Sequence, residues 1–260
     1  MMKDEYSQLI DEHHKWLKGF EEERLRLWKK LCNANLEAAL CEAATRKLLV
    51  GHGCDVEPFE DRASGGVDFK CSKNGNTFYV EATCITKEVA SEQSGLTHLP
   101  NKASYYKFLT RTIWQELCNK TPQCSGLDTS CIVVIGTFHF QVGCRCFRDL
   151  AAEDLLTGKT YITQRIDTKS GEAVGEAYQS TKLESAAFIR PDKNSPNLFE
   201  HARCPISAVL LCSFGTDPIK TTGILHPDPN NPFNRDLLSD IKFCKLADGY
   251  KNGSLEVEWI

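Results

Sequence analysis

Two carboxylates lie close to a predicted β-hairpin turn. Asp68 follows the glycine pair at 65–66, and Glu81 lies inside the apolar and β-branched run "TFYVEATC". Asn74 and Gly75, between the two runs, form a dipeptide that is a strong signal for a two-residue hairpin turn. Because such a hairpin pairs its two strands, we expect Asp68 and Glu81 to approach each other.

Two carboxylates that share a site repel each other unless a positive charge lies between them. Mg²⁺ or Mn²⁺ is the natural partner, since these hard cations are held by one or two carboxylates and keep several waters. Such an ion activates water and stabilises charge on a phosphate under attack. The alternative is structural: Asp68 ends a turn, and Glu81 pairs with a lysine or arginine on a hydrated sheet face. The spacing leaves both interpretations open.

The face on which each strand residue lies follows from the alternation of side chains along a strand. Tyr79, Glu81 and Thr83 share one face of the predicted second strand, and Val80 and Ala82 share the other. Glu81 and Thr83 therefore point the same way, separated by one residue of opposite direction.

Three segments together resemble a known family. "CEAATRKLLVGHGCDV" carries Glu42 on a predicted helix, "GGVDF" carries Asp68, and "YVEATC" carries Glu81 followed by Thr83. This order is similar to that of the PD-(D/E)XK nuclease superfamily, which has a helix glutamate, a hairpin aspartate and a Glu-x-Lys on the next strand. The resemblance covers roughly residues 36–140 and implies a restriction-endonuclease-like fold with nuclease activity.

The resemblance also implies a ligand set for Mg²⁺ or Mn²⁺. Asp68, Glu81 and the backbone carbonyl of Ala82 would bind the metal, and Glu42 would reach it directly or through water. Glu42 lies at the rim of the apolar arc of its predicted helix, and Glu37, nearer to that arc, is the reserve candidate.

The sequence departs from the family pattern at the position of the motif lysine, where it has Thr83. That lysine positions the attacking water or stabilises charge on the phosphate, whereas threonine can orient water but supplies no positive charge. Lys102 is the first candidate to supply the missing charge, followed by Lys70 and Lys87. Without such a cation, the same fold would be a catalytically inactive binding or interaction module.

Basic residues occur in two groups. Lys102, Lys107 and Arg111 alternate with aromatic residues, and this group is the predicted path of a nucleic-acid backbone. The run "RLRLWKK" at 24–30 has the composition of a solvated helix face. The formal net charge of −4 indicates that any nucleic-acid surface is local.

The predicted elements follow from hydrophobic periodicity. One amphipathic helix is expected over 5–31, with His13 and His14 on its exposed or semi-buried face, and a second over 36–50, capped by Asn33 or Asn35. The other predicted elements are strands at 67–71 and 77–85, a helix at 101–119, buried strands at 131–140 and 206–214, a short helix near 147–157, and an irregular segment at 225–234.

These elements predict an α/β fold with a restriction-endonuclease-like mixed central sheet flanked by helices. Residues 1–35 would be an N-terminal helical extension, and residues 36–260 a single nuclease-like domain with a C-terminal elaboration. "LLTGKT" at 155–160 lacks the first glycine of a phosphate-binding loop, so a helix end followed by a turn is expected there.

The composition sets the remaining expectations. The 260 residues contain 41% hydrophobic and 25% charged side chains, and no apolar run is long enough to cross a bilayer. The 13 cysteines include no CxxC pair, and the polar N-terminus does not have the pattern of a signal peptide. We therefore expect reduced cysteines in a cytoplasmic protein, with the oligomeric state left open.

Two functions remain at this point. The first is a metal-dependent nuclease-like enzyme that hydrolyses phosphodiester bonds of DNA or RNA. The second is an inactive nuclease-fold module. A third reading, a metal-free protein whose carboxylates are simply solvated, also stays open. A cation near the Thr83 hydroxyl in three dimensions would favour the first.

Overall fold

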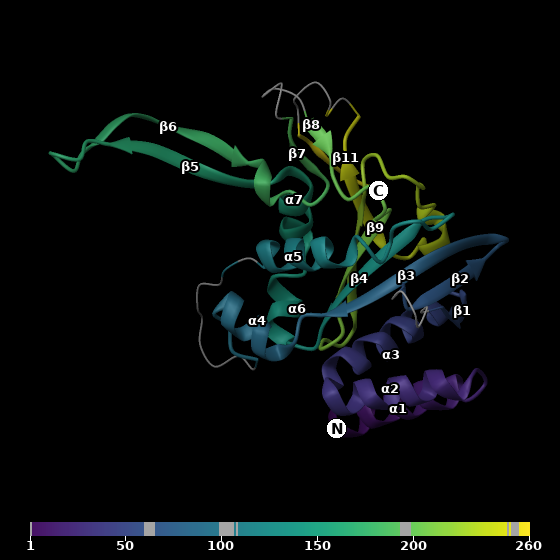
Figure 1. The fold of residues 1–260 in the computed structure, drawn as a ribbon. Coiled ribbons are helices and arrows are strands. Elements are labelled where there is room, and N and C mark those ends of the chain that lie inside the picture. Colours follow the sequence, from purple (N-terminus) through teal and green to yellow (C-terminus); the bar gives the residue numbers. More distant parts are fainter. Residues whose placement is uncertain are drawn as a thin grey trace.

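The computed structural model describes residues 2–59, 66–98, 107, 109–192, 199–248, 250 and 255–260. Its centre is an eight-stranded mixed sheet with the order β1-β2-β3-β4-β9-β10-β11-β12. Helices α1 to α3 cover one face of this sheet, and α4 to α7 lie on the other (Figure 1). The predicted α/β class, with a mixed central sheet flanked by helices, is confirmed.

The N-terminal segment forms a helical hairpin. Helix α1 spans Met2–Leu17 and α2 spans Glu22–Ala34, so the single helix predicted over 5–31 is wrong. The chain turns at Gly19, a poor helix former, and the turn folds α2 back so that Trp28 stacks on His13 with ring centroids 4.9 Å apart. A straight helix would leave both rings in water, and burial of the aromatic surface favours the turn.

Helix α3 spans Leu36–Gly51, close to its predicted bounds. Its N-cap is Asn35, whose side-chain oxygen accepts a hydrogen bond from the amide of Ala38. Lys47 of α3 pairs with Glu12 of α1 at 3.0 Å, and this ion pair joins the helical hairpin to the helix beneath it.

The predicted hairpin is confirmed with a small shift of its strands. Strand β1 is Asp55–Pro58, β2 is Phe69–Lys73 and β3 is Asn76–Cys84. Asn74 and Gly75 have φ angles of 52° and 75°, as a two-residue type I′ turn requires. The register places Phe69 opposite Val80, which brings Asp68 next to Glu81 at the end of the pairing.

The second half of the core adds α4 (Lys87–Ser94), α5 (Thr110–Lys120) and β4 (Cys131–Thr137). Strand β4 runs parallel to β3 and is buried throughout, as its continuous apolar run predicted. It ends earlier than the predicted residue 140, because the His139 side chain instead caps helix α6 (Phe140–Arg145) by accepting a hydrogen bond from the Val142 amide. Most of the first half of the helix predicted over 101–119 lies outside the described residues.

The C-terminal half completes the sheet and adds a long two-stranded ribbon. Helix α7 (Asp149–Thr157) ends within "LLTGKT", as expected, but Gly158 leads directly into a strand that begins at Lys159, and the expected turn is not formed. The remaining elements are β5 (Lys159–Ile166), β6 (Ala173–Lys182), η1 (Leu183–Ser185), β7 (Ile189–Pro191), β8 (Phe199–His201), β9 (Ala208–Ser213), β10 (Lys220–Leu225), η2 (Arg235–Leu238), β11 (Lys242–Leu246) and β12 (Val257–Trp259). Figure 1 shows the β5–β6 ribbon projecting away from the body.

The cysteines behave as small apolar residues. All 13 are free, and burial raises the pKa of Cys212 and Cys244 to about 12, which keeps these thiols protonated. Among the described residues, no helix is both long and apolar enough to span a bilayer.

Candidate functional site

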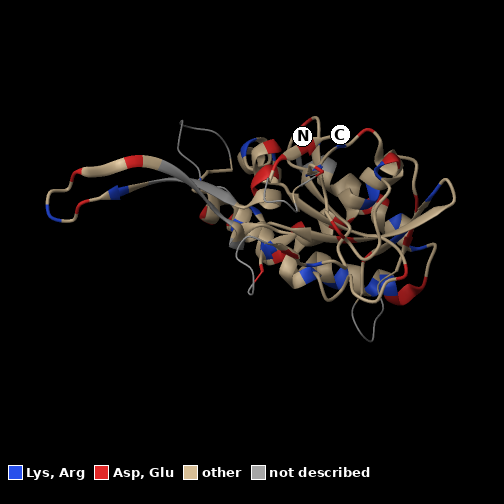
Figure 2. Cartoon of the chain, turned by 90° about the horizontal axis from the view of Figure 1, so that it is seen from above, with Lys and Arg blue, Asp and Glu red and all other residues tan. Residues whose placement is uncertain are grey.

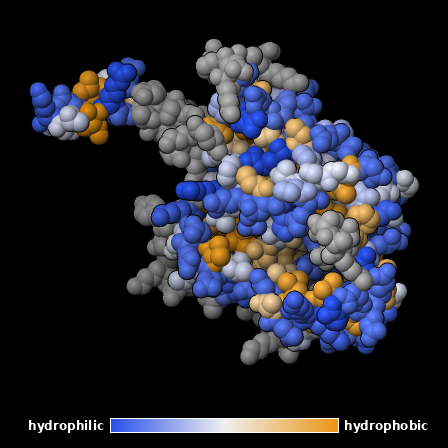
Figure 3. Space-filling view, in the orientation of Figure 1, coloured by the Kyte–Doolittle hydropathy of each residue, from blue (hydrophilic) through white to orange (hydrophobic). Residues whose placement is uncertain are grey.

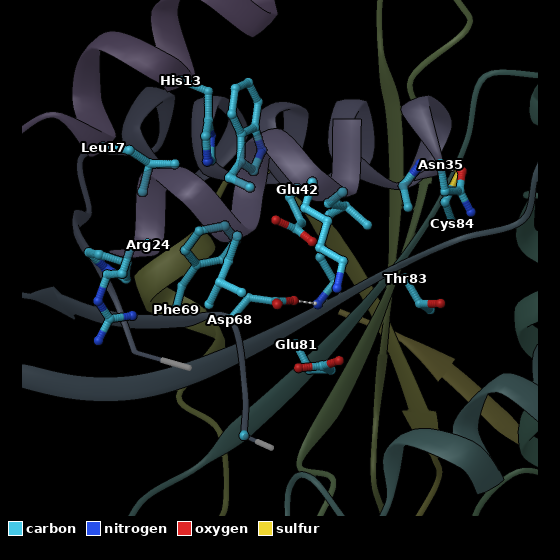
Figure 4. Close-up of a pocket in the computed structure, with 18 of the residues that line it drawn as sticks. His13, Leu17, Arg24, Asn35, Glu42, Asp68, Phe69, Glu81, Thr83 and Cys84 are labelled. Carbon is cyan, nitrogen blue, oxygen red and sulfur yellow. Dashed lines mark hydrogen bonds between the residues drawn. The ribbon is translucent and has the colours of Figure 1, made fainter. Parts of the chain in front are cut away.

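A cavity of about 530 Å³ opens beside the first residue of β2, where β3 continues beyond its pairing with β2. Glu42, Asp68 and Glu81, the three predicted acidic residues, all line it. Figure 4 shows their side chains coming from α3, from the segment before β2 and from β3, with Glu42 and Glu81 on either side of the β3 ribbon. The three predicted acidic residues thus lie on the lining of one cavity, and their joint role in binding a metal stays a prediction.

Asp68 is held by the strand that carries Glu81. Its Oδ2 accepts a hydrogen bond of 2.7 Å from the amide of Ala82. Beyond Val80 the neighbouring strand no longer pairs with β3, so the Asp68 carboxylate takes up a backbone donor at the sheet edge. This bond fixes Asp68 beside the residue that follows Glu81, at the place where the resemblance puts the metal.

The three carboxylates act on one another electrostatically. Burial raises the pKa of Asp68 well above its ordinary value, and the charges of Glu81 and then Glu42 raise it further. The Ala82 amide and the charge of Lys120 act in the opposite direction but do not compensate. A cation at this place would remove the cost of ionising Asp68.

Lys120 supplies a cation that the sequence analysis missed. Its Nζ lies 2.6 Å from Glu81 Oε1, and the Glu81 side chain is only 2% exposed. Burial acts to lower the pKa of Lys120, but the charge of Glu81, their hydrogen bond and the charges of Asp68 and Glu116 outweigh it, and the pKa is raised. Lys120 lies far along α5 from the motif, and only its i+4 spacing from Glu116 marked it in the sequence.

This ion pair bears on the structural alternative in which Glu81 pairs with a lysine or arginine. Glu81 does pair with a lysine, as the non-functional reading expected, but it lies in a buried place and not on a hydrated sheet face. A buried pair beside a further carboxylate is costly to build for stability alone. Such perturbed groups in a cavity are typical of functional sites.

Thr83 lines the cavity, but its hydroxyl is directed away from Asp68 and Glu42 (Figure 4). The hydroxyl donates a hydrogen bond of 3.0 Å to Glu116 Oε2. Because its hydrogen is engaged, the hydroxyl can orient a water only as an acceptor. Glu116 thus links Thr83 to the helix turn that carries Lys120.

The other predicted candidates lie elsewhere. Glu37, the reserve acid, accepts a hydrogen bond from the amide of Lys87 at 2.8 Å and does not line the cavity. Lys107 and Arg111 are exposed and also lie outside the lining, and so do the reserve cations Lys70 and Lys87. Lys102, the first candidate for the missing charge, lies outside the described residues.

The basic run at 24–30 is divided between two faces of α2. Arg24 and Lys30 line the cavity, while Arg26 and Lys29 are exposed on the outside of the helix. The prediction that this run is only a solvated face is therefore wrong for Arg24, which is half-buried, whereas Lys30 lines the cavity and is also exposed. The reason is tertiary: the turn at Gly19 folds α2 over the carboxylates, which no pattern within the run reveals.

His13 also differs from its expected position. It is 2% exposed, packed between Trp16 and Trp28, and burial lowers its pKa to about 3, with a smaller contribution from the charge of Arg46. It is a neutral residue of the helical hairpin. His14 next to it is half-buried, within the range expected for both.

The donor chemistry fits a divalent ion with two protein carboxylates. Within the described residues, no group of three or more His, Cys, Asp or Glu side chains is arranged to hold a metal. Asp68 and Glu81 nevertheless suffice for Mg²⁺, which keeps most of its waters. Of the Asp68 oxygens, Oδ1 accepts no hydrogen bond from the described residues and is left for such a ligand.

The wider surface shows no single basic face. Lys and Arg alternate with Asp and Glu over the body of the molecule in Figure 2. Positive charge at the site is thus local, as the net charge indicated. Scans of the chain against protein-family models, curated proteins and solved structures gave no match.

Proposed function

We propose that this chain is a divalent-metal-dependent phosphodiesterase of the PD-(D/E)XK kind, acting on DNA or RNA. The observation that carries the proposal is the meeting of Asp68, Glu81 and Lys120 in one cavity, with the lysine 2.6 Å from Glu81. A carboxylate pair and one ammonium group are what the family pattern requires, and here the ammonium comes from α5 in place of the strand.

The arrangement of elements supports the resemblance. Glu42 lies on a helix, Asp68 just before a hairpin strand and Glu81 on the next strand, followed by a helix and a buried parallel strand. This is the order read from the sequence, and the lining of one cavity by all three acids supports it. The specific restriction-endonuclease-like fold is part of the proposal.

The proposed mechanism assigns a role to each side chain. Asp68 and Glu81 would hold Mg²⁺ or Mn²⁺ with the Ala82 carbonyl, and Glu42 would bind through water. When bound, such an ion polarises a phosphate oxygen and lowers the pKa of a water.

Lys120, Glu116 and Thr83 would position the reacting groups and balance their charge. Lys120 places its ammonium group where charge develops on the phosphate, in a site that is largely shielded from water and where that charge counts most. Glu116 orients Thr83 and favours the charged form of Lys120.

A second candidate is an inactive binding module with the same fold. The observation that favours it is the ion pair itself, since Lys120 neutralises Glu81 without any metal. In this case the pair would be a relic that stabilises the edge of β3. The two candidates differ in whether a divalent ion is bound.

The test is cleavage of a labelled panel of DNA and RNA with Mg²⁺ or Mn²⁺. We expect metal-dependent cleavage by the wild type and a loss of at least about 100-fold in Asp68→Asn and Glu81→Gln. Asp55→Asn, an exposed aspartate of β1 outside the cavity, is the matched control and should cleave normally.

Thermal unfolding with and without Mg²⁺ separates the two candidates. A ligand that binds the folded state raises Tm, so the wild type should be stabilised and Asp68→Asn should not. Absence of cleavage and of any Mg²⁺ or Mn²⁺ shift, in protein that is folded, would refute the enzyme and leave the binding module.

A further inference from the structure

The cavity has two walls of opposite chemistry. The carboxylates and Lys120 form one wall, on the sheet side. The helical hairpin forms the other, with His13, Trp16, Leu17, Leu27, Trp28 and Leu31. The ligand that fits both walls therefore has an anionic end and a flat apolar end.

Helix α2 places two cations at the margin of its apolar wall. Arg24, Leu27, Trp28 and Leu31 occupy positions i, i+3, i+4 and i+7, which puts them on one helix face. Lys30 also lines the cavity. Within the described residues neither Arg24 nor Lys30 forms an ion pair, in contrast to Arg26, which pairs with Glu23 on the outside. Both cations are thus available to an anionic ligand.

The size of the cavity restricts the substrate further. About 530 Å³ lies within the roughly 300–1,000 Å³ of pockets that enclose one small molecule. A base inside a duplex is stacked on both sides and paired, so it cannot enter such a space without leaving the helix. An unpaired nucleotide can place its base on an apolar wall and its phosphates on cations.

We propose that the cavity admits one unpaired nucleotide of a strand, so that the substrate class is single-stranded nucleic acid. The base lies against Leu27 and Leu31 of α2, Arg24 and Lys30 bind the phosphates on either side, and the scissile phosphate lies at the carboxylates. The inference rests on the proposed function in taking a phosphodiester as the anionic group. It also makes α2 the element that selects the substrate.

The first experiment measures binding and not cleavage. Fluorescence anisotropy of labelled single-stranded DNA, single-stranded RNA and blunt duplex DNA is recorded in EDTA and again with Ca²⁺. We expect tighter binding of single strands than of the duplex. Arg24→Gln and Lys30→Gln should each lose about five-fold in affinity at roughly 0.1 M salt, and about 0.7 in the slope of log K against log salt.

Matched controls separate site cations from general charge. Arg26→Gln and Lys29→Gln remove the same charge from the outer face of the same helix. They should leave affinity and salt slope nearly unchanged. Equal losses in all four variants, or equal binding of duplex and single strand in both buffers, would overturn the proposal, as would the absence of binding.

The apolar wall is tested with an abasic strand. Loss of the bases should weaken binding to the wild type about ten-fold, the magnitude of one stacked base. Leu27→Gln, checked for an unchanged circular dichroism spectrum, should remove most of that difference, while Leu27→Met should keep it. An unchanged abasic effect in a folded Leu27→Gln variant would contradict the assignment of the wall.

Failure here is distinct from failure of the proposed function. Metal-dependent cleavage of duplex and single strands at equal rates would leave the phosphodiesterase standing and overturn the substrate class. Selective single-strand binding through Arg24 and Lys30 without cleavage would uphold this inference and favour the binding module.

Discussion

At the scale of residues, the site depends on a charge that comes from outside the motif. Lys120 reaches Glu81 from the last residue of α5, while position 83 of β3 holds a threonine that turns to Glu116. An ammonium group acts through its distance from the reacting atoms, so the element that carries it can differ from the motif strand. The substitution at Thr83 is thus compatible with phosphodiester chemistry.

Replacement of Lys120 tests this role. Lys120→Met should lower the free energy of unfolding by about 1.5–3 kcal/mol, because Glu81 then keeps a buried charge without this donor. It should also lower the cleavage rate at least about ten-fold. Lys120→Arg should restore most of the stability, and Lys70→Met is the control. A loss of stability without loss of rate would make Lys120 purely structural.

Asp68 provides a prediction on pH. Its pKa is raised in the folded protein, so between the ordinary value and the raised value the folded state holds a proton that the unfolded chain releases. Stability of the metal-free protein therefore falls as pH rises through this interval. Asp68→Asn, which keeps an acceptor for the Ala82 amide, removes this cost.

The measurement compares Tm of wild type and Asp68→Asn in EDTA at several pH values. The variant should be more stable near pH 8 and lose its advantage towards about pH 4, and a gain of about 1 kcal/mol corresponds to roughly 2–4 °C. Mg²⁺ should reverse the order by stabilising only the wild type. A constant difference between the two proteins across pH would show that Asp68 does not titrate as inferred.

At the scale of elements, the helical hairpin of α1 and α2 forms one wall of the site. It is held by a small aromatic cluster in which His13 packs between Trp16 and Trp28, and by the ion pair of Glu12 with Lys47. If the cavity binds the proposed substrate, the integrity of this cluster should affect that binding, because the helical hairpin lines the cavity.

Acid should weaken this hairpin through His13. Burial lowers its pKa to about 3, so the unfolded chain gains a proton below about pH 6.5 while the folded chain does not. Stability therefore falls as pH decreases from about 6.5 towards 3, by on the order of 3 kcal/mol at about pH 4. His13→Phe should flatten this part of the profile, measured by urea unfolding, whereas His14→Phe should keep most of it. An unchanged slope in His13→Phe would refute the assignment.

At the scale of the whole molecule, the β5–β6 ribbon stands apart from the site. It projects from the side of the body opposite to α1 and α2 (Figure 1 and Figure 3), and the side chains of residues 164–177 are exposed. Ile166 and Val174 are 63% and 51% exposed, so they contribute little to the core. An exposed two-stranded ribbon adds little stability of its own.

Replacement of residues 164–177 by an Asn-Gly turn should therefore be tolerated. We expect Tm to change by less than about 2 °C and cleavage of short oligonucleotides to be unchanged, as measured by thermal unfolding and the labelled panel. A loss of cleavage with an unchanged Tm would assign the ribbon a part in substrate binding.

Local chemistry explains the parts that the sequence predicts. Asn74-Gly75 requires two positive φ angles and so specifies the hairpin and its register, which places Asp68 beside Glu81. The apolar run at 131–140 predicts a strand buried on both faces, which the structure has at 131–137, and of the two predicted caps, Asn33 and Asn35, Asn35 starts α3. Each signal lies within a few residues of the structure it determines.

Tertiary packing decides the rest. The turn at Gly19, the approach of Lys120 to Glu81 and the position of Arg24 over the cavity depend on contacts between elements far apart in the chain. The burial of aromatic surface favours the turn, and Lys120 offsets the cost of a charge on buried Glu81, and both effects act through space. By itself the sequence determines the acids and the hairpin that joins them; the cation beside them and the wall opposite them exist only in the folded chain.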